Sequence, residues 1–470
     1  MRTKISRATV VTPFSRFQAD IMCRDGVIEG LVEPSRGGVA DEAIDVAGKL
    51  VFPGFIDPHV HSRDPGLTHK EDFAHSTRAA AAGGITTILE MPNALPPVAD
   101  VPSFRHRAAR HSEVASVDFG LWALSLGSEN LDQVPRLVEE GAVGVKLFWG
   151  YALHRVTRQL VYNLADEPPE QLILPPTNGE VLELFATVAK AGGLLAAHCE
   201  DREVIEASQR ALRHDLEGYG DLLAARPDVA EATAIATAAE LARATGCRFH
   251  VVHLSSARGV EIVRQSQRAG ISITAETCPQ YLTLTDEDYR LIGPMMKVYP
   301  PIRRAADREA LWQGLLDGTI TSVGSDHAPH TVEEKQQPLA AQPAGCIGVE
   351  TLAPVMLNAM TQGRISAERL AWVCSEGTAR LYGLYPQKGA ILPGSDADFT
   401  IVDPQAEWQI DNAHLHSKHK LSPWHGRRVR GRPVVGVLRG QVIMRDGEPV
   451  GAPSGRLVRP RHPQGRAARA

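Results

Sequence analysis

From residue 51 onward the chain repeats one pattern, in which short apolar segments alternate with longer segments of helical periodicity. Eight of the apolar segments are predicted strands, at 51–56, 85–91, 116–124, 142–148, 193–198, 248–254, 271–276 and 319–325. Helices are predicted among them at 69–82, 131–140, 179–191, 230–244 and 257–267. Near-continuous apolar strands separated by helices pair in parallel. Eight such units predict an α/β fold of the (β/α)8 TIM-like barrel type.

An open, doubly wound sheet is the other architecture that such a repeat allows. That fold commonly carries a G-x-G-x-x-G motif directly after its first strand. No such motif follows residues 51–56. The closed barrel is therefore the favoured prediction.

The two ends of the chain follow a different pattern. Residues 1–50 alternate short apolar runs with turn residues, and Asp25-Gly26 between two such runs predicts a hairpin. Residues 386–450 return to β character after helices predicted at 349–360, 367–374 and 377–382. Because the ends of compact folds often lie close together, we expect both ends to form one small β-sandwich domain beside a barrel spanning 51–385.

Three further segments stand outside this scheme. Loops 155–178 and 331–345 are longer than a plain barrel needs, which predicts lids or substrate walls on the catalytic face. For the first loop, a simple surface insertion is an equal alternative. Residues 451–470 are rich in Pro, Gly and Arg, and we expect a tail that is mobile or packed on a neighbouring molecule.

Charge and composition exclude several classes of partner. A formal net charge of -5 gives no electrostatic basis for binding nucleic acid or an anionic membrane surface. The chain contains no run of 18 apolar residues, so no membrane-spanning helix is predicted. The first residues lack the apolar core of a secretory signal. The six cysteines contain no C-x-x-C pair, which is typical of free thiols in a reducing compartment. We therefore expect a cytoplasmic protein.

The stretch FPGFIDPHVHSR, which includes the first predicted barrel strand, carries a pair of histidines. His59 and His61 lie two residues apart, so the period of a strand turns both to the same side. Two imidazoles that converge from one strand end are suitable neighbouring ligands for a transition metal. Taken alone, such a pair is more often two polar residues where a strand leaves the core.

Further polar residues stand at the ends of later predicted strands, and these are Lys146, His198, His253 and Asp326. Residues at the carboxyl ends of barrel strands are typically catalytic. Four imidazoles and a carboxylate suit Zn²⁺. Each residue also has a simpler explanation, since His198 or His253 could be a hydrogen-bonded core histidine and Asp326 a helix cap. Lysine is rarely buried unpaired, so Lys146 inside an apolar strand is unusual. Together these residues favour a metal site.

These stretches resemble the amidohydrolase superfamily, and within it the cyclic amidohydrolases, which include dihydroorotase, allantoinase and hydantoinase/dihydropyrimidinase. The matching stretches are PGFIDPHVHSRDPG, KEDFAHSTRAAAAGGITTILEMPN, GVKLFWG, AHCED, VVHLSSARG, AETCPQYLTLT, SDHAPHTVEEK, GVETLAPVML and SKHKLSPWHG. They follow one another from about residue 51 to the 430s, and so cover nearly the whole chain.

The resemblance implies a site with two Zn²⁺ per chain. The more buried metal would be bound by His59, His61 and Asp326, the more exposed one by His198 and His253, and both by a carbamylated Lys146. A pair of cations lowers the pKa of a bound water and polarises a carbonyl. Asp326 would take the proton of the attacking water and pass it to the leaving ring nitrogen. The implied reaction is hydrolysis of a cyclic amide C–N bond, or its reverse.

The resemblance also implies which residues contact the substrate. Arg63 shares the direction of His61, and its guanidinium could bind a carboxylate through two hydrogen bonds. In dihydroorotases the residues that match Arg63, Asn93 and His330 hold the substrate carboxylate. Their other interpretations are a loop ion pair for Arg63, a turn residue for Asn93 and a solvated loop residue for His330.

The chain departs from the dihydroorotase pattern at several positions. Tyr299 stands where Asn is usual, Ala344 stands where Phe is frequent, and HLREPG reads HSRDPG with Ser62 and Asp64. Allantoinases and hydantoinases, however, usually lack an arginine at the position of Arg63. The prediction is therefore dihydroorotase, which interconverts N-carbamoyl-L-aspartate and L-dihydroorotate. Allantoinase or hydantoinase/dihydropyrimidinase is the alternative, and a non-catalytic assembly partner is a remote one. Relatives are commonly dimers or tetramers, so we expect a homo-oligomer.

Overall fold

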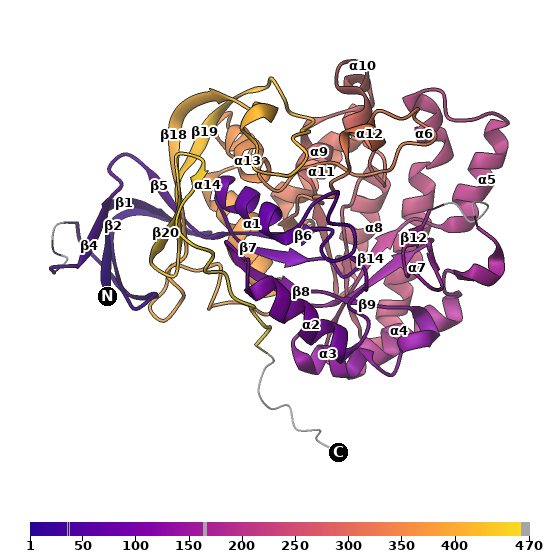
Figure 1. Cartoon of the computed structure of the whole chain (residues 1–470), viewed down its shortest axis with the longest axis horizontal. Coiled ribbons are helices and arrows are strands. Elements are labelled where there is room, and N and C mark those ends of the chain that lie inside the picture. Colours follow the sequence, from indigo (N-terminus) through magenta and orange to yellow (C-terminus); the bar gives the residue numbers. More distant parts are fainter. Residues whose placement is uncertain (35, 37, 163–166, 462–470) are drawn as a thin grey trace.

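The computed structural model describes residues 1–34, 36, 38–162 and 167–461. A nine-stranded sheet forms one end of the molecule, and an α/β body with parallel strands forms the other (Figure 1). The indigo strands of the N-terminus and the yellow strands of the C-terminus lie side by side in the sheet (Figure 1). Strands from both chain ends therefore share one sheet.

Strand β5 joins the two halves of this sheet. The strands are β1 (Arg2–Val11), β2 (Arg16–Arg24), β3 (Val27–Val32), β4 (Glu42–Asp45), β5 (Leu50–Pro53), β18 (Phe399–Gln409), β19 (Arg428–Leu438), β20 (Gln441–Arg445) and β21 (Glu448–Pro449). Their order is β21-β20-β19-β18-β5-β1-β2-β3, and β4 pairs with β1. β5 runs parallel to β1 and antiparallel to β18. This bridge makes the sheet continuous through β5, and the β-sandwich form of the small domain stays a prediction.

The α/β body contains two sheets in which every pair is parallel. One comprises β6 (Phe55–Val60), β7 (Ile85–Glu90) and β8 (Asp118–Leu121). The other comprises β9 (Ala123–Leu124), β10 (Val145–Trp149), β14 (Leu194–Cys199), β15 (Arg248–Val251), β16 (Ile273–Thr277) and β17 (Ser322–Val323). All eight predicted strands are present, the third being divided into β8 and β9.

The two sheets approach each other at both edges. Only Trp122 separates β8 from β9 along the chain. At the other edge Val60 forms a parallel bridge with His327, and the His61 N–H donates to the His327 carbonyl at 2.8 Å. The first and last strands of the α/β body therefore meet beside His59 and His61.

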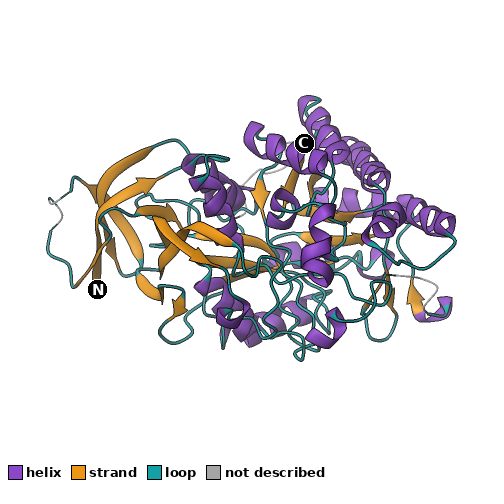
Figure 2. Ribbon diagram, turned by 90° about the horizontal axis from the view of Figure 1, so that it is seen from above, coloured by secondary structure: helices purple, strands orange, loops and turns teal. Residues whose placement is uncertain are grey.

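Helices flank the parallel strands (Figure 2). The longer ones are α1 (Phe73–Ala82), α2 (Val101–Ser112), α3 (Val134–Glu140), α4 (Asn178–Lys190), α5 (Arg202–Leu212), α6 (Tyr219–Ala225), α7 (Asp228–Thr245), α8 (Ala257–Arg268), α11 (Ala305–Asp317) and α13 (Leu352–Thr361). α1 begins later than predicted because Asp72 caps it by accepting a hydrogen bond from the His75 N–H. Within the described ranges, no helix combines the length and apolarity needed to cross a bilayer.

The first predicted strand is in fact two strands that belong to different sheets. Leu50–Pro53 is β5 of the nine-stranded sheet, whereas Phe55–Val60 is β6 of the α/β body. The break falls at Gly54, where a Cβ would clash with the side chains of Thr86 and Asp398. Because the apolar run continues through Gly54, hydrophobicity alone could not reveal this boundary. His59 consequently lies within β6 and not beyond it.

The expectation of a mobile or externally packed tail is wrong for residues 451–461. The Phe119 N–H donates to the Arg456 carbonyl at 3.0 Å, and the Val458 N–H donates to the Phe119 carbonyl at 2.7 Å. This segment therefore lies along β8 of its own chain. The rest of the predicted tail, 462–470, lies outside the described residues.

A buried ion cluster links the α/β body to the nine-stranded sheet. The Lys388 ammonium lies 2.6 Å from Asp398 and 2.8 Å from Asp396, and it also pairs with Asp118 of β8. Arg439 pairs with the same Asp118. Burial opposes the charge on Lys388, but the surrounding carboxylates raise its pKa above the usual value. The ammonium therefore stays charged and offsets the buried carboxylates.

We expect Lys388→Met to lower the free energy of unfolding by about 3–5 kcal/mol, because buried carboxylates would lose their shared cation. Urea unfolding followed by circular dichroism measures this change. Arg7→Met removes an exposed ion pair with Asp45 and should change stability little. Equal stability losses in the two variants would show that the cluster does not hold the two parts together.

Candidate metal centre and substrate pocket

One pocket collects most of the residues that the sequence singled out. Its lining includes His59, His61, Arg63, Asn93, Lys146, His198, His253 and Asp326. The ninth residue, His330, does not line it but stands behind Arg63, with 3.4 Å between its Nε2 and a guanidinium nitrogen. The polar residues that end the parallel strands thus converge at one place.

The first group of candidate ligands comes from β6 and from the turn after β17. The Nε2 atoms of His59 and His61 lie 3.3 and 3.5 Å from Oδ1 of Asp326. One ligand atom from each of the three residues lies within 4.8 Å of the others. Burial lowers the pKa of His61 to about 4, so this imidazole is neutral and can offer a lone pair to a metal.

The second group lies at the ends of β14 and β15. Nδ1 of His198 is 3.1 Å from Nε2 of His253, so the two rings point at a common position. Burial lowers the pKa of both residues, that of His253 well below its usual value. Two neutral imidazoles facing one point are suited to bind a second divalent cation.

Lys146 reaches the pocket from β10. Its side chain is fully buried, and its Nζ has no hydrogen-bond partner among the described residues. Burial lowers the pKa of this amine to about 8. An unpartnered polar group in the interior is costly. Nε2 of His59, which faces Asp326, is likewise buried without a hydrogen bond among the described residues. A donor set of this kind fits divalent metal binding.

Two buried carboxylates orient the histidines, and the sequence analysis did not identify them. Glu276 of β16 binds Nδ1 of His59, which leaves Nε2 facing Asp326. Glu200 accepts a hydrogen bond from Nε2 of His198 at 2.8 Å, which leaves Nδ1 for the position shared with His253. Such carboxylates fix the tautomer of metal-binding histidines. The sequence does contain a pattern that could have identified Glu276, because this residue, like Lys146, is a charged residue inside an apolar strand.

Arg226 supports the wall of the pocket from behind. It pairs with Glu200 and donates to the Tyr151 hydroxyl at 2.7 Å. Its guanidinium also lies 3.7 Å from the centre of the Tyr299 ring. The tyrosine that replaces the usual asparagine is therefore stacked on a cation and forms part of the pocket wall. No motif in the sequence indicated this arrangement.

The segment after β6 is fastened to the end of β7. The Ser62 N–H lies 3.1 Å from both carboxylate oxygens of Glu90, and its hydroxyl donates to Glu90 at 2.7 Å. Nδ1 of His61 lies 2.7 Å from Oδ1 of Asn93. Ser62 is thus held between the two residues that point into the pocket, His61 and Arg63. Asn93 orients His61 in addition to lining the pocket.

Arg63 is the cation best placed to meet a substrate. Its Nε donates to the Pro329 carbonyl at 3.2 Å. In the described part of the chain, no carboxylate forms an ion pair with it. His330 contacts the Ala344 carbonyl at 3.0 Å and is buried, which contradicts its interpretation as a solvated loop residue. The roles of Arg63, Asn93 and His330 in substrate binding stay predictions.

Both long loops contribute to the pocket wall. Leu160 and Tyr162 come from the first loop, and the Tyr162 ring meets the Tyr151 ring edge-on with 4.9 Å between their centres. Ala344 and Gly345 come from the second loop. Residues 163–166 of the first loop lie outside the described residues. The interpretation of these loops as substrate walls therefore fits their described parts.

Comparisons with known proteins agree with this arrangement. A model of the Amidohydrolase family matches residues 50–443. An allantoinase of Rubrobacter xylanophilus is 38% identical, over 95% of each chain. An L-hydantoinase of Paenarthrobacter aurescens is 35% identical over 92% of each chain, and a dihydroorotase of Geobacter sp. is 34% identical over 95% of this chain and 100% of the relative. The solved structure of an L-hydantoinase from Arthrobacter aurescens matches with a TM-score of 0.90 and 33% identity, covering 97% of this chain and 99% of the other.

We expect Glu276→Gln to weaken divalent-metal binding about 10- to 100-fold, because an amide cannot fix the His59 ring as a carboxylate does. Competition with a zinc-binding dye measures the affinity. Glu376→Gln is the matched control, since Glu376 is a buried carboxylate that pairs with Arg380 and does not line the pocket. Equal affinities in the two variants would contradict the orienting role of Glu276.

Proposed function

Because the chain belongs to the amidohydrolase family, we propose that it is a metal-dependent hydrolase that opens the C–N bond of a cyclic amide. One observation carries the proposal: a single pocket gathers four imidazoles, the carboxylate of Asp326 and the unpartnered amine of Lys146. These groups match the needs of hydrolytic metal chemistry, and the names of the relatives point to cyclic amides.

The proposal includes two Zn²⁺ held by the chain's own side chains. His59, His61 and Asp326 would hold one, and His198 and His253 the other. Lys146 would bridge them after its neutral amine adds to CO₂ and loses a proton, which produces an anionic carbamate. Its lowered pKa favours this step, because a larger fraction of the amine is neutral near pH 8. When bound, such cations polarise a carbonyl and lower the pKa of a water.

Asp326 is proposed as the group that moves the proton. Burial alone would raise its pKa, but His59 and His61 lower it, so the carboxylate is ionised and can accept a proton. It would take this proton from the attacking water and then pass it to the ring nitrogen as the C–N bond breaks. The aromatic wall and the loops at the pocket would limit the access of bulk water.

The proposal also covers the architecture that holds the site. The two parallel sheets would form one closed (β/α)8 barrel within residues 51–385, beginning at β6, supported by their approach at both edges. Residues 1–50 and 386–450, together with the whole of β5, would form the smaller β domain, followed by the segment from 451 to 470. The cytoplasmic location and the homo-oligomeric state stay predictions.

The comparisons change the order of the candidate substrates. The sequence prediction placed dihydroorotase first, whereas the relatives favour its alternative, because allantoinases reach 38% identity and the L-hydantoinase 35%, against 34% for the dihydroorotase. Tyr299 also departs from the dihydroorotase pattern. We therefore place allantoin and substituted hydantoins first.

Dihydroorotate is retained as a second candidate because of Arg63. The guanidinium is buried and lines the pocket, and no carboxylate of the described residues pairs with it, which favours a substrate that carries its own carboxylate. His330 stands close enough to share in that contact. This geometry does not depend on which relative is most similar.

A panel of allantoin, substituted hydantoins, L-dihydroorotate and N-carbamoyl-L-aspartate, tested with zinc-loaded protein, decides between these substrates. We expect allantoin or a hydantoin to show the highest kcat/KM. Failure to convert any compound would contradict the proposed function. Arg63→Gln on the same panel should lower kcat/KM for L-dihydroorotate about 10- to 100-fold, since a hydrogen bond to a charged group contributes about 1.5–3 kcal/mol. Equal losses on neutral hydantoins would remove Arg63 from carboxylate recognition.

Lys146→Ala should lose nearly all activity and retain less metal than the wild type, because the bridging anion is removed. Short carboxylic acids such as acetate should restore part of both, since their carboxylate can occupy the place of the carbamate. Activity and metal content measured across an acetate series provide the test. An inactive variant with two tightly bound metals, unaffected by acetate, would argue against the carbamate.

A further inference from the structure

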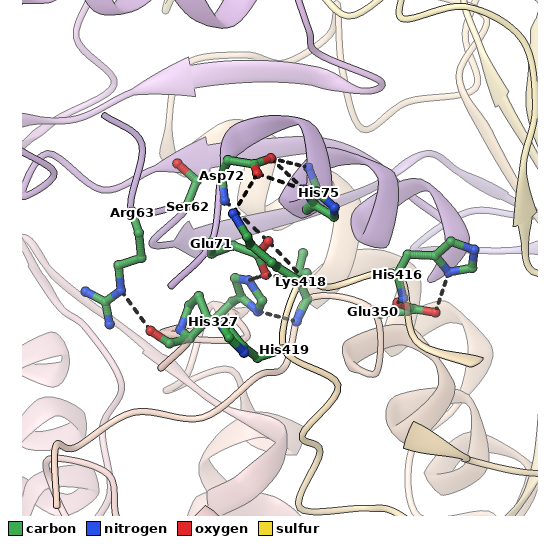
Figure 3. A network of polar contacts seen from close by, with 12 residues as sticks. Ser62, Arg63, Glu71, Asp72, His75, His327, Glu350, His416, Lys418 and His419 are labelled. Carbon is green, nitrogen blue, oxygen red and sulfur yellow. Dashed lines mark hydrogen bonds and ion pairs between the residues drawn. The ribbon is translucent and has the colours of Figure 1, made fainter. Parts of the chain in front are cut away.

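A segment from the C-terminal part of the chain reaches the edge of the candidate site. This strap, residues 415–426, connects β18 to β19 and carries the SKHKLSPWHG stretch, which the proposed reaction leaves without a role. The Lys418 N–H lies 3.2 Å from both carboxylate oxygens of Glu71. The Lys418 ammonium donates to the Thr68 carbonyl at 2.6 Å, and His419 Nε2 contacts the His69 carbonyl at 2.9 Å. The strap is thus fastened to the chain just before α1 (Figure 3).

Glu71, although next to a helix start, is not needed to cap it. Asp72 already caps α1 by accepting the His75 N–H at 2.9 Å. The Glu71 side chain is fully buried, and its Oε2 lies 3.7 Å from Nε2 of His327 (Figure 3). A buried carboxylate needs compensating contacts. It finds them in the N–H groups of Lys418 and Asp72, and Nε2 of His327 faces it from just beyond hydrogen-bond distance.

His327 directly follows Asp326, and its ring has a defined protonation. Nδ1 accepts hydrogen bonds from the N–H groups of Gly348 at 3.2 Å and Val349 at 3.4 Å. The ring proton of the neutral imidazole must therefore be on Nε2, which faces Glu71. The His327 carbonyl accepts the His61 N–H at 2.8 Å, so this residue links the histidines of β6 to Asp326 within the first group of candidate ligands.

The strap binds residues on both sides of the His327 ring without contacting the ring itself. On one side the Lys418 N–H binds Glu71. On the other, the His416 N–H donates to Glu350 at 2.7 Å and its Nδ1 lies 3.0 Å from the same carboxylate. Glu350 directly follows Val349, whose N–H contacts His327. A single segment therefore fixes the two partners between which His327 is placed.

Asp326 needs such support, because its backbone lies in the left-handed region at φ +48°. A residue with a side chain adopts this conformation at a cost in free energy, and its surroundings must hold it there. We propose that Glu71, held by the strap, is a positioning residue that fixes His327 and thereby the direction of the Asp326 carboxylate. This inference rests on the proton-transfer role of Asp326 given in the proposed function.

Two changes test the link, one at each end of the contact. Glu71→Gln replaces the carboxylate with an amide of the same size. Lys418→Pro removes the backbone N–H that Glu71 accepts, and Lys418→Ala is its matched control, because it retains that N–H. We expect Glu71→Gln and Lys418→Pro to lower kcat about 10- to 100-fold, since small misplacements of a reacting group have effects of this size. KM and metal content should remain near the wild-type values.

A second readout does not depend on activity. Amide hydrogen exchange of the peptide that spans 326–330 should become faster in Glu71→Gln and Lys418→Pro, and stay near the wild-type rate in Lys418→Ala. Wild-type kcat and wild-type exchange in Glu71→Gln, or equal effects of the Pro and Ala changes, would overturn the inference. If Glu71→Gln does not fold, the Pro and Ala pair makes the same comparison. If the wild-type protein converts no compound of the panel, the proposed function fails, while exchange still decides whether the strap fixes this segment.

Discussion

The burial of polar groups that cannot satisfy one another is the constraint on which the site depends. The carboxyl ends of the parallel strands place imidazoles, a carboxylate and the amine of Lys146 in one buried pocket. Each would be costly there on its own. Carboxylates behind them, Glu276 and Glu200, satisfy one side of the rings and leave the other side facing inward. The fold therefore keeps several buried polar atoms without a protein partner at this place, among them Nε2 of His59 and Nζ of Lys146 in the described part of the chain.

Much of this arrangement could be predicted from the sequence, because it depends on local patterns. The eight apolar segments and the polar residues that end them are visible as short-range periodicities, as at His59 and His61. Lys146 was recognisable because a lysine inside an apolar strand is rare. The division of the first predicted strand was not visible, since the apolar run passes through Gly54 without a break and only contacts with Thr86 and Asp398 show the boundary.

The supporting residues were harder to predict because their partners are far away in the chain. Arg226 contacts Glu200, Tyr151 and Tyr299, and these three partners come from three different segments of the chain. No spacing in the sequence encodes such a meeting. The choice of substrate depends on similar details, which is why one arginine favoured dihydroorotate while similarity over the whole chain favours the allantoinases and hydantoinases.

The strap has a consequence for the order in which the protein folds during its synthesis on the ribosome. The hydrogen bonds between Lys418 and Glu71 join residues 347 positions apart. Contacts of such long range form late, since the intervening chain must first be made and arranged. All strands of the α/β body can be synthesised before the strap that binds Glu71 has been made. The edge of the candidate site therefore reaches its final geometry only after the strap has left the ribosome.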